Sequence, residues 1–257
     1  MLSYVHKFGK KKMNYVQKLK WLILSGITET FSEEPVNRIR PLVQNQPDTK
    51  PEAVQKPLPE KDVALYQAET LGKGAHNLAE LYQSRRAFDG CALKKTAAHT
   101  LNGHGADQPQ VLCYVEAPDT ADDKAGRLMS GAAGELLDKM LAAIGLNLNQ
   151  NAYVSSLIPW RPPGNRKPSE AEHALCKPFW EREIALLKPK VIILLGANVS
   201  GAVLGVSALS KARGVWHDFQ GIPVRVSIAP ATLIKFPAQK KQAWEDLQQV
   251  QKKLGEL

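Results

Sequence analysis

The stretch that decides the fold is Tyr153–Leu195, YVSSLIPWRPPGNRKPSEAEHALCKPFWEREIALLKPKVIILL. Residues 153–158 are a short apolar run rich in residues that favour strands, and Pro162–Asn165 predicts a turn after it. Ser169 stands three residues before Glu172, which is the spacing of a capping box at the start of a helix. The stretch therefore predicts a strand, a loop and a helix in succession.

The rest of the stretch completes a βαβ unit. Apolar residues recur at steps of three and four along the helix and form one face, made of Ala174, Leu175, Phe179, Trp180, Ile184 and Leu187. Lys188-Pro189 ends the helix, and Val191–Leu195 has the pattern of a strand buried on both faces of a parallel sheet. The loop after the first strand carries Arg161, Arg166 and Lys167, and it lies at the end of the strand where open α/β sheets bind ligands.

The same alternation continues on both sides of this unit. The other predicted strands are Val111–Val115 and Pro223–Ile228. The other predicted helices cover residues 131–144, 197–204 and 238–254, with loops over 116–130 and 229–236. Strands that alternate with helices predict an α/β fold with three α/β/α layers and a central, mainly parallel four-stranded sheet.

The N-terminal quarter differs from the rest in composition. Residues 1–40 hold eight Lys and Arg against three acidic residues, a net +5, and residues 14–31 predict an amphipathic helix. Residues 41–60 contain five prolines between polar residues, which is typical of a disordered linker. We therefore divide the chain into a basic segment (1–40), a linker (41–60) and a domain (61–257) that begins with a helix over 61–86. Met13 is an alternative start of the basic segment.

Charge and cysteine content limit the function classes. The net charge of +9 suits a polyanion such as nucleic acid, although residues 88–257 contribute only 20 basic against 16 acidic residues, or +4. Three cysteines without a close pair argue against a disulfide framework and favour a reducing compartment, so we expect a cytoplasmic protein. No apolar run is long enough to span a bilayer, so we expect no membrane partner.

The loops after the strands carry a more specific signal than the fold. In order they are Glu116-Ala117-Pro118, Gly131–Gly134, Arg161–Pro168, Leu187–Gly196 and Pro230-Ala231. In this order and spacing, residues from about 85 to 250 resemble the family 4 uracil-DNA glycosylases, the iron–sulfur branch of that superfamily. The resemblance implies a protein that flips a nucleotide out of DNA and hydrolyses its N-glycosidic bond, a DNA repair reaction.

The resemblance also assigns the chemical groups, and most of them are changed here. The family's Gly-Glu-Ala-Pro-Gly loop is Val115–Asp119, so Glu116 is the retained catalytic carboxylate beside Ala117, Pro118 and Asp119. The family's stacking Phe corresponds to Met129, its uracil-reading Asn to Ser156 and its His to Ala229. Turnover is therefore in doubt from the sequence.

The cluster ligands are changed in the same way. The four family cysteines correspond to Phe88, Cys91, Trp160 and Cys176, so only two thiols remain as metal ligands. A thiolate cluster takes four ligands, and the two aromatic side chains offer apolar volume in its place. We therefore expect no cofactor, although an iron–sulfur cluster is typical of the family.

The remaining assignments concern DNA and the histidines. We expect Arg161, Asn165, Arg166 and Lys167 to contact phosphates, and Leu233 is a candidate wedge at the base that leaves the stack. Asp122 and Asp123 are expected to be solvated loop charges, and His173 to be structural or at the surface.

Three functions stay open on the sequence alone. The first is a divergent glycosylase that acts on uracil or another deaminated base through Glu116. The second is a catalytically silent relative that still binds uracil-containing or single-stranded DNA. The third is a module for a non-DNA partner, bound through residues 1–40. In each case we expect a monomer.

Overall fold

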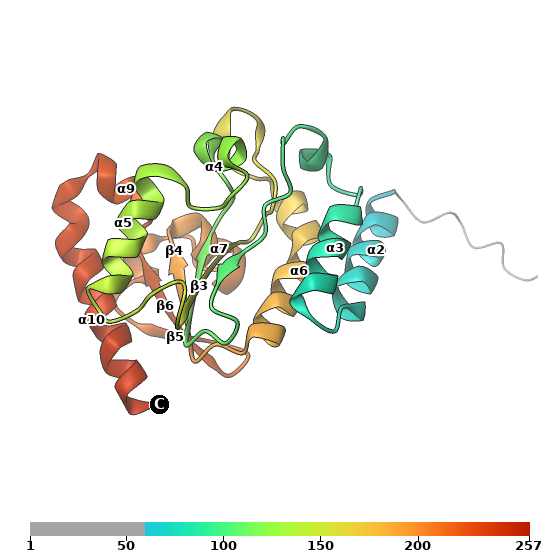
Figure 1. Cartoon of the computed structure of the whole chain (residues 1–257). Helices are drawn as coiled ribbons and strands as arrows, with labels where there is room; N and C mark the ends of the chain where they lie inside the picture. Colours follow the sequence, from blue (N-terminus) through green and yellow to red (C-terminus); the bar gives the residue numbers. More distant parts are fainter. Residues whose placement is uncertain (1–59) are drawn as a thin grey trace, which may run out of the picture. The chain divides into compact units, whose positions relative to one another are not determined.

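The computed structural model describes residues 60–257, and Figure 1 shows them in colour. The predictions for the basic segment, its helix and the linker up to residue 59 lie outside the described residues. The domain predicted from residue 61 is described from its first helix onward.

A six-stranded sheet with the order β1-β3-β2-β4-β6-β5 lies at the centre of the domain. Its strands are β1 (His104–Gly105), β2 (Val111–Val115), β3 (Ala152–Ser156), β4 (Val191–Leu195), β5 (Trp216–Phe219) and β6 (Ile222–Ser227). The four strands β3, β2, β4 and β6 pair in parallel, with Tyr114 opposite both Ser155 and Leu194. These are the four strands that the sequence predicts, and the α/β class is confirmed.

The two edge strands were not predicted, and both are antiparallel. β1 has only two residues, so it carries no periodic pattern. β5 is short and only partly buried, and it joins β6 through Gln220 and Gly221. Both turn residues have positive φ, 54° and 84°, which is the geometry of a tight hairpin turn.

Helices cover both faces of the sheet, which gives the three predicted layers (Figure 1). The longer ones are α2 (Glu60–Gly74), α3 (Leu78–Ala87), α5 (Gly131–Ala142), α6 (Glu170–Leu187), α7 (Ala197–Leu204) and α10 (Lys240–Glu256). The short ones are α4 (Thr120–Ala125), α8 (Leu209–Ala212), α9 (Pro230–Lys235) and the 3₁₀ turns η1 (Ala92–Lys95), η2 (Pro163–Asn165) and η3 (Pro237–Gln239). In Figure 1, α5, α9 and α10 lie on one side of the sheet, and α2, α3 and α6 on the other.

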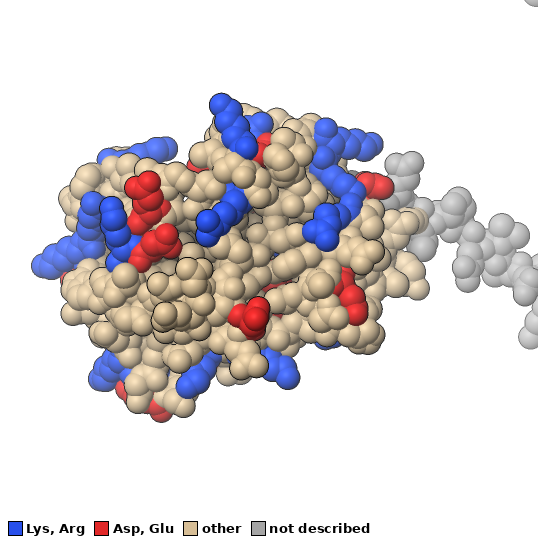
Figure 2. All heavy atoms as spheres, in the orientation of Figure 1, with Lys and Arg blue, Asp and Glu red and all other residues tan. Residues whose placement is uncertain are grey.

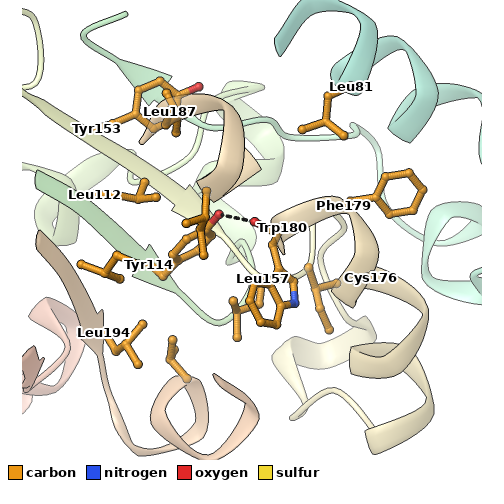
Figure 3. Close-up of a cluster of buried hydrophobic side chains, with 14 of the residues drawn as sticks. Leu81, Leu112, Tyr114, Tyr153, Leu157, Cys176, Phe179, Trp180, Leu187 and Leu194 are labelled. Carbon is orange, nitrogen blue, oxygen red and sulfur yellow. Dashed lines mark hydrogen bonds between the residues drawn. The ribbon is translucent and has the colours of Figure 1, made fainter. Parts of the chain in front are cut away.

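Alternate residues of the buried strands supply two separate cores. Leu112, Tyr114, Ile192 and Leu194 point toward the core under α3, α6 and α7, part of which Figure 3 shows. Val111, Cys113, Val115 and their counterparts in β4 point toward the core under α5, α9 and α10. A strand buried on both faces is apolar throughout, which explains why Val191–Leu195 has no polar alternation.

Three predicted segments need correction. The loop 229–236 contains α9, because Pro230 takes the first helical position, where its missing N–H is not needed. The loop 116–130 contains α4, which Asp119 caps. The helix over 61–86 is two helices, because Asn77 accepts a hydrogen bond from the backbone of Glu80 and starts α3. The boundaries of the other predicted strands and helices lie within two residues of the prediction, and the capping box of Ser169 at α6 is confirmed.

A buried polar network joins α3, α6 and the sheet. The Glu183 carboxylate is fully buried and accepts hydrogen bonds from Arg85 at 3.1 Å, Tyr82 at 2.8 Å, Tyr114 at 2.7 Å and Ser155 at 2.7 Å. Tyr114 also donates to the backbone oxygen of Trp180, the dashed line in Figure 3. The network fixes the position of α6 against β2 and β3.

Among the described residues, no helix is both long and apolar enough to cross a membrane.

Candidate functional site

A cavity of about 480 Å³, which we call the first cavity, opens at the carboxyl ends of β2, β4 and β6. This is the edge where open α/β sheets bind ligands. Apolar residues make up most of its wall, among them Val115, Leu195 and Ile228 from the strand ends. The polar side chains of its lining are Glu116, Asp119, Asp122, Asn198 and Thr232. The volume is sufficient for a nucleobase.

Glu116 follows β2 directly and is held from one side. Asn198, in the first turn of α7, donates from Nδ2 to Glu116 Oε2 at 2.8 Å. Nε2 of His173, on α6, lies 3.7 Å from Glu116 Oε1. The Glu116 side chain is 22% exposed, so a carboxylate with a fixed direction faces a partly enclosed cavity. Such a group can orient and deprotonate a water molecule.

The acidic residues after Glu116 have structural roles. Asp119 accepts hydrogen bonds from the backbone N–H groups of Ala121 and Asp122, so it caps α4 while it lines the cavity. Asp122 accepts from the backbone of Asp119 and Ser130, and burial raises its pKa. The prediction that Asp122 and Asp123 are solvated charges is wrong, because they are only 4% and 5% exposed.

Met129 lines the first cavity from the loop before α5. Its φ is 54°, a left-handed conformation that costs energy for a residue with a side chain. A Cβ on Gly134 would lie 1.7 Å from the Met129 backbone oxygen. Only a glycine at position 134 therefore lets α5 pack this closely against the loop that carries Met129. The position of the Met129 side chain is therefore set by the backbone around it.

The other predicted pocket residues are not all at the cavity. Ala117 and Ala229 line it with their methyl groups. Ser156 is buried, and its hydroxyl donates to the backbone oxygen of Ile158 at 2.8 Å, so it does not line the first cavity. Pro118 is buried beside the cavity and is not part of its lining. The cavity therefore has the Glu116 carboxylate in its wall, and Ser156 contributes no polar group to it.

Two of the three basic side chains in the loop after β3 are held by acids. Arg161 Nε donates to Asp123 Oδ2 at 3.0 Å, and Arg166 pairs with both oxygens of Glu172, at 2.7 and 2.9 Å. Burial would raise the pKa of Asp123, but the N–H groups of Ala98 and His99 together with Arg161 lower it overall. Lys167 is exposed and has no ion pair among the described residues.

The remaining two DNA-binding candidates have different positions. Asn165 is exposed and exchanges hydrogen bonds with Thr120 of α4. Leu233 is 1% exposed and packs in the core under α9, so it is not available as a wedge. The exposed apolar side chains of the same segment are Ile234 and Phe236, at 45% and 58%. The helix α9 turns Leu233 inward and leaves its neighbours at the surface.

Comparisons with known proteins show the family to which the chain belongs. The family model of the Uracil DNA glycosylase superfamily matches residues 102–248, more than half of the chain. The type-4 uracil-DNA glycosylase of Sulfurisphaera tokodaii is 31% identical over 170 residues, which are 62% of this chain and 77% of that protein. The chain belongs to the type-4 uracil-DNA glycosylase family.

Two further relatives carry the same name. The type-4 uracil-DNA glycosylase of Pyrobaculum aerophilum is 29% identical over 180 residues, 66% of this chain and 91% of that protein. The one from Archaeoglobus fulgidus is 28% identical over 176 residues, 65% and 86% of the two chains. The chain thus spans most of the length of these glycosylases.

The iron–sulfur cluster typical of type-4 glycosylases does not fit the residues present. Phe88 and Trp160, which the resemblance assigns to two of the four ligand positions, are almost fully buried and have ring centroids 6.4 Å apart. Phe179 packs on Phe88 at 5.4 Å. Among residues 60–257, no three His, Cys, Asp or Glu side chains are grouped to hold a metal ion. Aromatic rings fill the volume that a cluster would need.

All three cysteines are free, buried thiols. A hydrogen bond between Cys91 and Cys176 lowers the pKa of Cys91 and raises that of Cys176, whose full burial adds to the rise. Cys113 lies in β2, where burial raises its pKa to about 12. None of the three is placed in the first cavity.

Sequence reasoning missed the two residues that contact Glu116. The sequence predicts a structural or surface role for His173 and gives no prediction for Asn198. Both stand on helices that follow other strands, so no local pattern connects them to Glu116. A polar residue three positions after Leu195, the end of a buried strand, was the one available signal for Asn198.

Proposed function

We propose that the protein is a DNA glycosylase that accepts a flipped deaminated base in the first cavity and hydrolyses its bond to deoxyribose slowly. The observation that carries the proposal is Glu116, held at the mouth of this cavity by Asn198 at 2.8 Å. The names of the relatives support the same reaction class. Flipping is required because the reacting atom of a base is not accessible inside a duplex.

In this reaction Glu116 acts on water. Its carboxylate orients the water and takes a proton as the oxygen attacks C1′ of the sugar. The bond between C1′ and the base nitrogen breaks, and its electron pair leaves with the base. An ionised Glu116 also stabilises the positive charge that develops on the sugar.

The rate of base excision should be low because the donor and the aromatic ring that the family uses on the base are replaced in this chain. Ala229 offers a methyl group where the family has an imidazole that donates to the departing base. Loss of one such donor typically costs about 10²–10³ in rate. Met129 gives the base a flexible contact surface in place of a rigid ring.

Base selectivity should be low for a related reason. Specific reading of uracil needs an amide that donates and accepts at the base edge. The Ser156 hydroxyl is committed to the backbone of Ile158, so it offers the base nothing. We therefore expect uracil and other deaminated bases to be accepted at similar rates.

The surface near the first cavity suits DNA. Lys and Arg side chains gather along the upper edge of the molecule in Figure 2, the edge at which α4 lies in Figure 1. Lys167 lies in the loop beside α4 and is free of ion pairs among the described residues. Phe236 is exposed next to a lysine, Lys235, in the segment that continues from the cavity wall. An exposed aromatic ring can stack on a base or enter a base step.

A second function, DNA binding without turnover, is favoured by the absent amide at Ser156 and the methyl group of Ala229. The two functions share the DNA surface and differ only in chemistry. They are separated by single-turnover assays with excess protein on oligonucleotides that contain uracil, hypoxanthine or xanthine, single- and double-stranded.

For the glycosylase we expect abasic sites from the wild type and only a small residual rate from Glu116→Gln, with equal DNA affinity of both proteins. The Glu116→Gln variant also excludes a contaminating enzyme. DNA binding without abasic sites on any of these substrates would leave the silent relative as the function. Absence of binding would exclude both functions.

A further inference from the structure

Glu116 separates two cavities. Behind the first cavity lies a second cavity of about 550 Å³, between the N-terminal half of α6 and α7. Glu116 and Asn198 belong to the lining of both. The second cavity is the more polar of the two in its side chains, with His173, Lys167, Lys177 and Glu170. The carboxylate thus has a base-facing side and a side that faces α6.

The side that faces α6 is where Glu116 is held. Asn198 Nδ2 donates to Oε2 at 2.8 Å, and His173 Nε2 is 3.7 Å from Oε1. One oxygen therefore has an amide partner and the other faces an imidazole. The His173 side chain is 18% exposed, and its Nδ1 is buried without a hydrogen-bond partner in the described part of the chain.

His173 is fixed in place by its helix. Its backbone N–H donates to Ser169 O in the capped first turn of α6, where Arg166 and Glu172 also pair. Phe179 and Trp180 anchor the next turns in the core. The imidazole consequently approaches Glu116 from a rigid element. Rigid support of this kind is what a catalytic carboxylate needs, since a shift of about 1 Å can cost roughly 10²-fold in rate.

We propose that His173 and Asn198 are positioning residues that hold Glu116 in its hydrolytic orientation. Asn198 fixes Oε2, and the His173 imidazole, with Nε2 3.7 Å from Oε1, restrains that oxygen from the second cavity. The other side of the carboxylate then faces the water and C1′. His173 does not replace the imidazole absent at Ala229, because it lies outside the first cavity. This role rests on the proposed glycosylase function.

The reaction balance is that of hydrolysis. The water oxygen bonds to C1′, the electron pair of the C1′–N bond leaves with the base, and the proton of the water goes to Glu116. His173 and Asn198 exchange no atom with the substrate. Their contribution is to the chemical step, so their removal should lower the rate constant and leave DNA affinity unchanged.

The test is a single-turnover assay on uracil-containing single-stranded DNA, with DNA affinity measured in parallel. We expect His173→Ala and Asn198→Ala each to lower the rate constant by roughly tenfold, with the dissociation constant unchanged within about twofold. His173→Gln and Asn198→Gln, which keep an N–H donor, should recover part of the rate. Lys177→Ala is the control, because Lys177 lines the same cavity from the same helix and has no contact with Glu116.

A mutant cycle separates positioning from a structural effect. In a Glu116→Gln background, with its residual rate, His173→Ala should have no further effect, since both act through one carboxylate. A wild-type rate in His173→Ala and Asn198→Ala, or an equal loss in Lys177→Ala, would overturn the positioning role and leave the glycosylase function intact. A wild type that forms no abasic sites would overturn the glycosylase function and this role together.

Discussion

At the scale of single residues, the site consists of one carboxylate in a mainly apolar cavity. Asn198 of α7 donates a hydrogen bond to Oε2 of Glu116, and Nε2 of His173 on α6 lies 3.7 Å from Oε1. Ala229 contributes a methyl group to the same cavity. The proposed slow turnover therefore rests on Ala229, which offers no donor to stabilise the leaving base.

Ala229→His should restore that stabilisation. Ala229 has ordinary extended backbone angles, φ −63° and ψ 139°, so a larger side chain needs no change of the backbone. We expect the single-turnover rate on uracil-containing DNA to rise by about 10²-fold, the typical effect of one donor. Thr232→His places an imidazole elsewhere on the same cavity wall and serves as the control. An equal gain in both variants, or a gain in neither, would contradict this account of Ala229.

The replaced cluster ligands lead to a prediction about metal. Because Phe88 and Trp160 fill the ligand space, we expect purified wild-type protein to be colourless and to keep its melting temperature in a chelator. Phe88→Cys combined with Trp160→Cys restores four thiols and should acquire visible absorbance after anaerobic reconstitution with iron and sulfide. Stoichiometric iron in the wild-type protein would contradict this prediction and show that two thiols together with other ligands can hold a cluster.

At the scale of elements, α6 is the part that connects the site to the core. Its first turn carries Glu172, which pairs with Arg166 of the preceding loop and bonds the N-cap Ser169. Its middle carries Cys176, and Glu183 near its end enters the buried network. Because His173 lies between these anchors, the geometry at Glu116 depends on interactions at both ends of the helix.

The first turn of α6 should respond to acid. The ion pair with Arg166 lowers the pKa of Glu172 from 4.5 to about 2. A lowered pKa means that the stabilisation is complete above about pH 4.5 and is lost as the pH falls toward 2. Since Arg166 is half exposed, solvent screens the ion pair, and we expect its contribution to the free energy of unfolding to be small. Urea unfolding of wild type and Glu172→Gln measures this effect. The difference in their free energies of unfolding should be largest at pH 7 and smaller at pH 3. A difference that does not change with pH would contradict a stabilising Glu172–Arg166 ion pair.

Substitution at the other end of α6 should destabilise the protein far more than substitution of Glu172. Glu183→Gln removes the charge that compensates the buried guanidinium of Arg85, so we expect a loss of about 3–5 kcal/mol in the free energy of unfolding. Glu181→Gln on the exposed side of the same helix should change it by less than about 0.5 kcal/mol. Equal effects of the two substitutions would show that the Glu183 network is not a principal support of α6.

At the scale of the whole molecule, we expect the proposed DNA binding to depend on how basic side chains are distributed over the edge above the sheet, which Figure 2 shows. Two of the three basic side chains in the loop after β3, Arg161 and Arg166, are held in ion pairs. The number of free cations, more than the net charge of +9, should determine affinity.

The salt dependence of DNA affinity tests this distribution. Lys167→Ala should reduce the slope of log K against log salt concentration by about 1, the effect of one phosphate contact. Arg166→Ala should reduce it less, because Glu172 already neutralises that guanidinium. Fluorescence anisotropy with a single-stranded oligonucleotide over a series of salt concentrations provides the measurement. A larger effect of Arg166 than of Lys167 would show that the Arg166–Glu172 pair opens on DNA.

The sequence by itself determined the elements that local physics controls. Apolar runs and the capping box of Ser169 predict the four parallel strands and α6, because burial and end-capping act within one element. The order of loop motifs also indicates the family. The edge strands and α9 were not predicted, since strands of two and four residues and a six-residue helix leave almost no periodic signal.

Only the tertiary structure decided what surrounds Glu116. Asn198 and His173 are 82 and 57 positions away in the sequence, and the parallel sheet brings their helices to one edge. It also turned Ser156 away from the cavity and Leu233 into the core. The physical reason is that burial fixes the direction of each side chain through packing between elements, and a one-dimensional pattern contains no information about which element lies opposite.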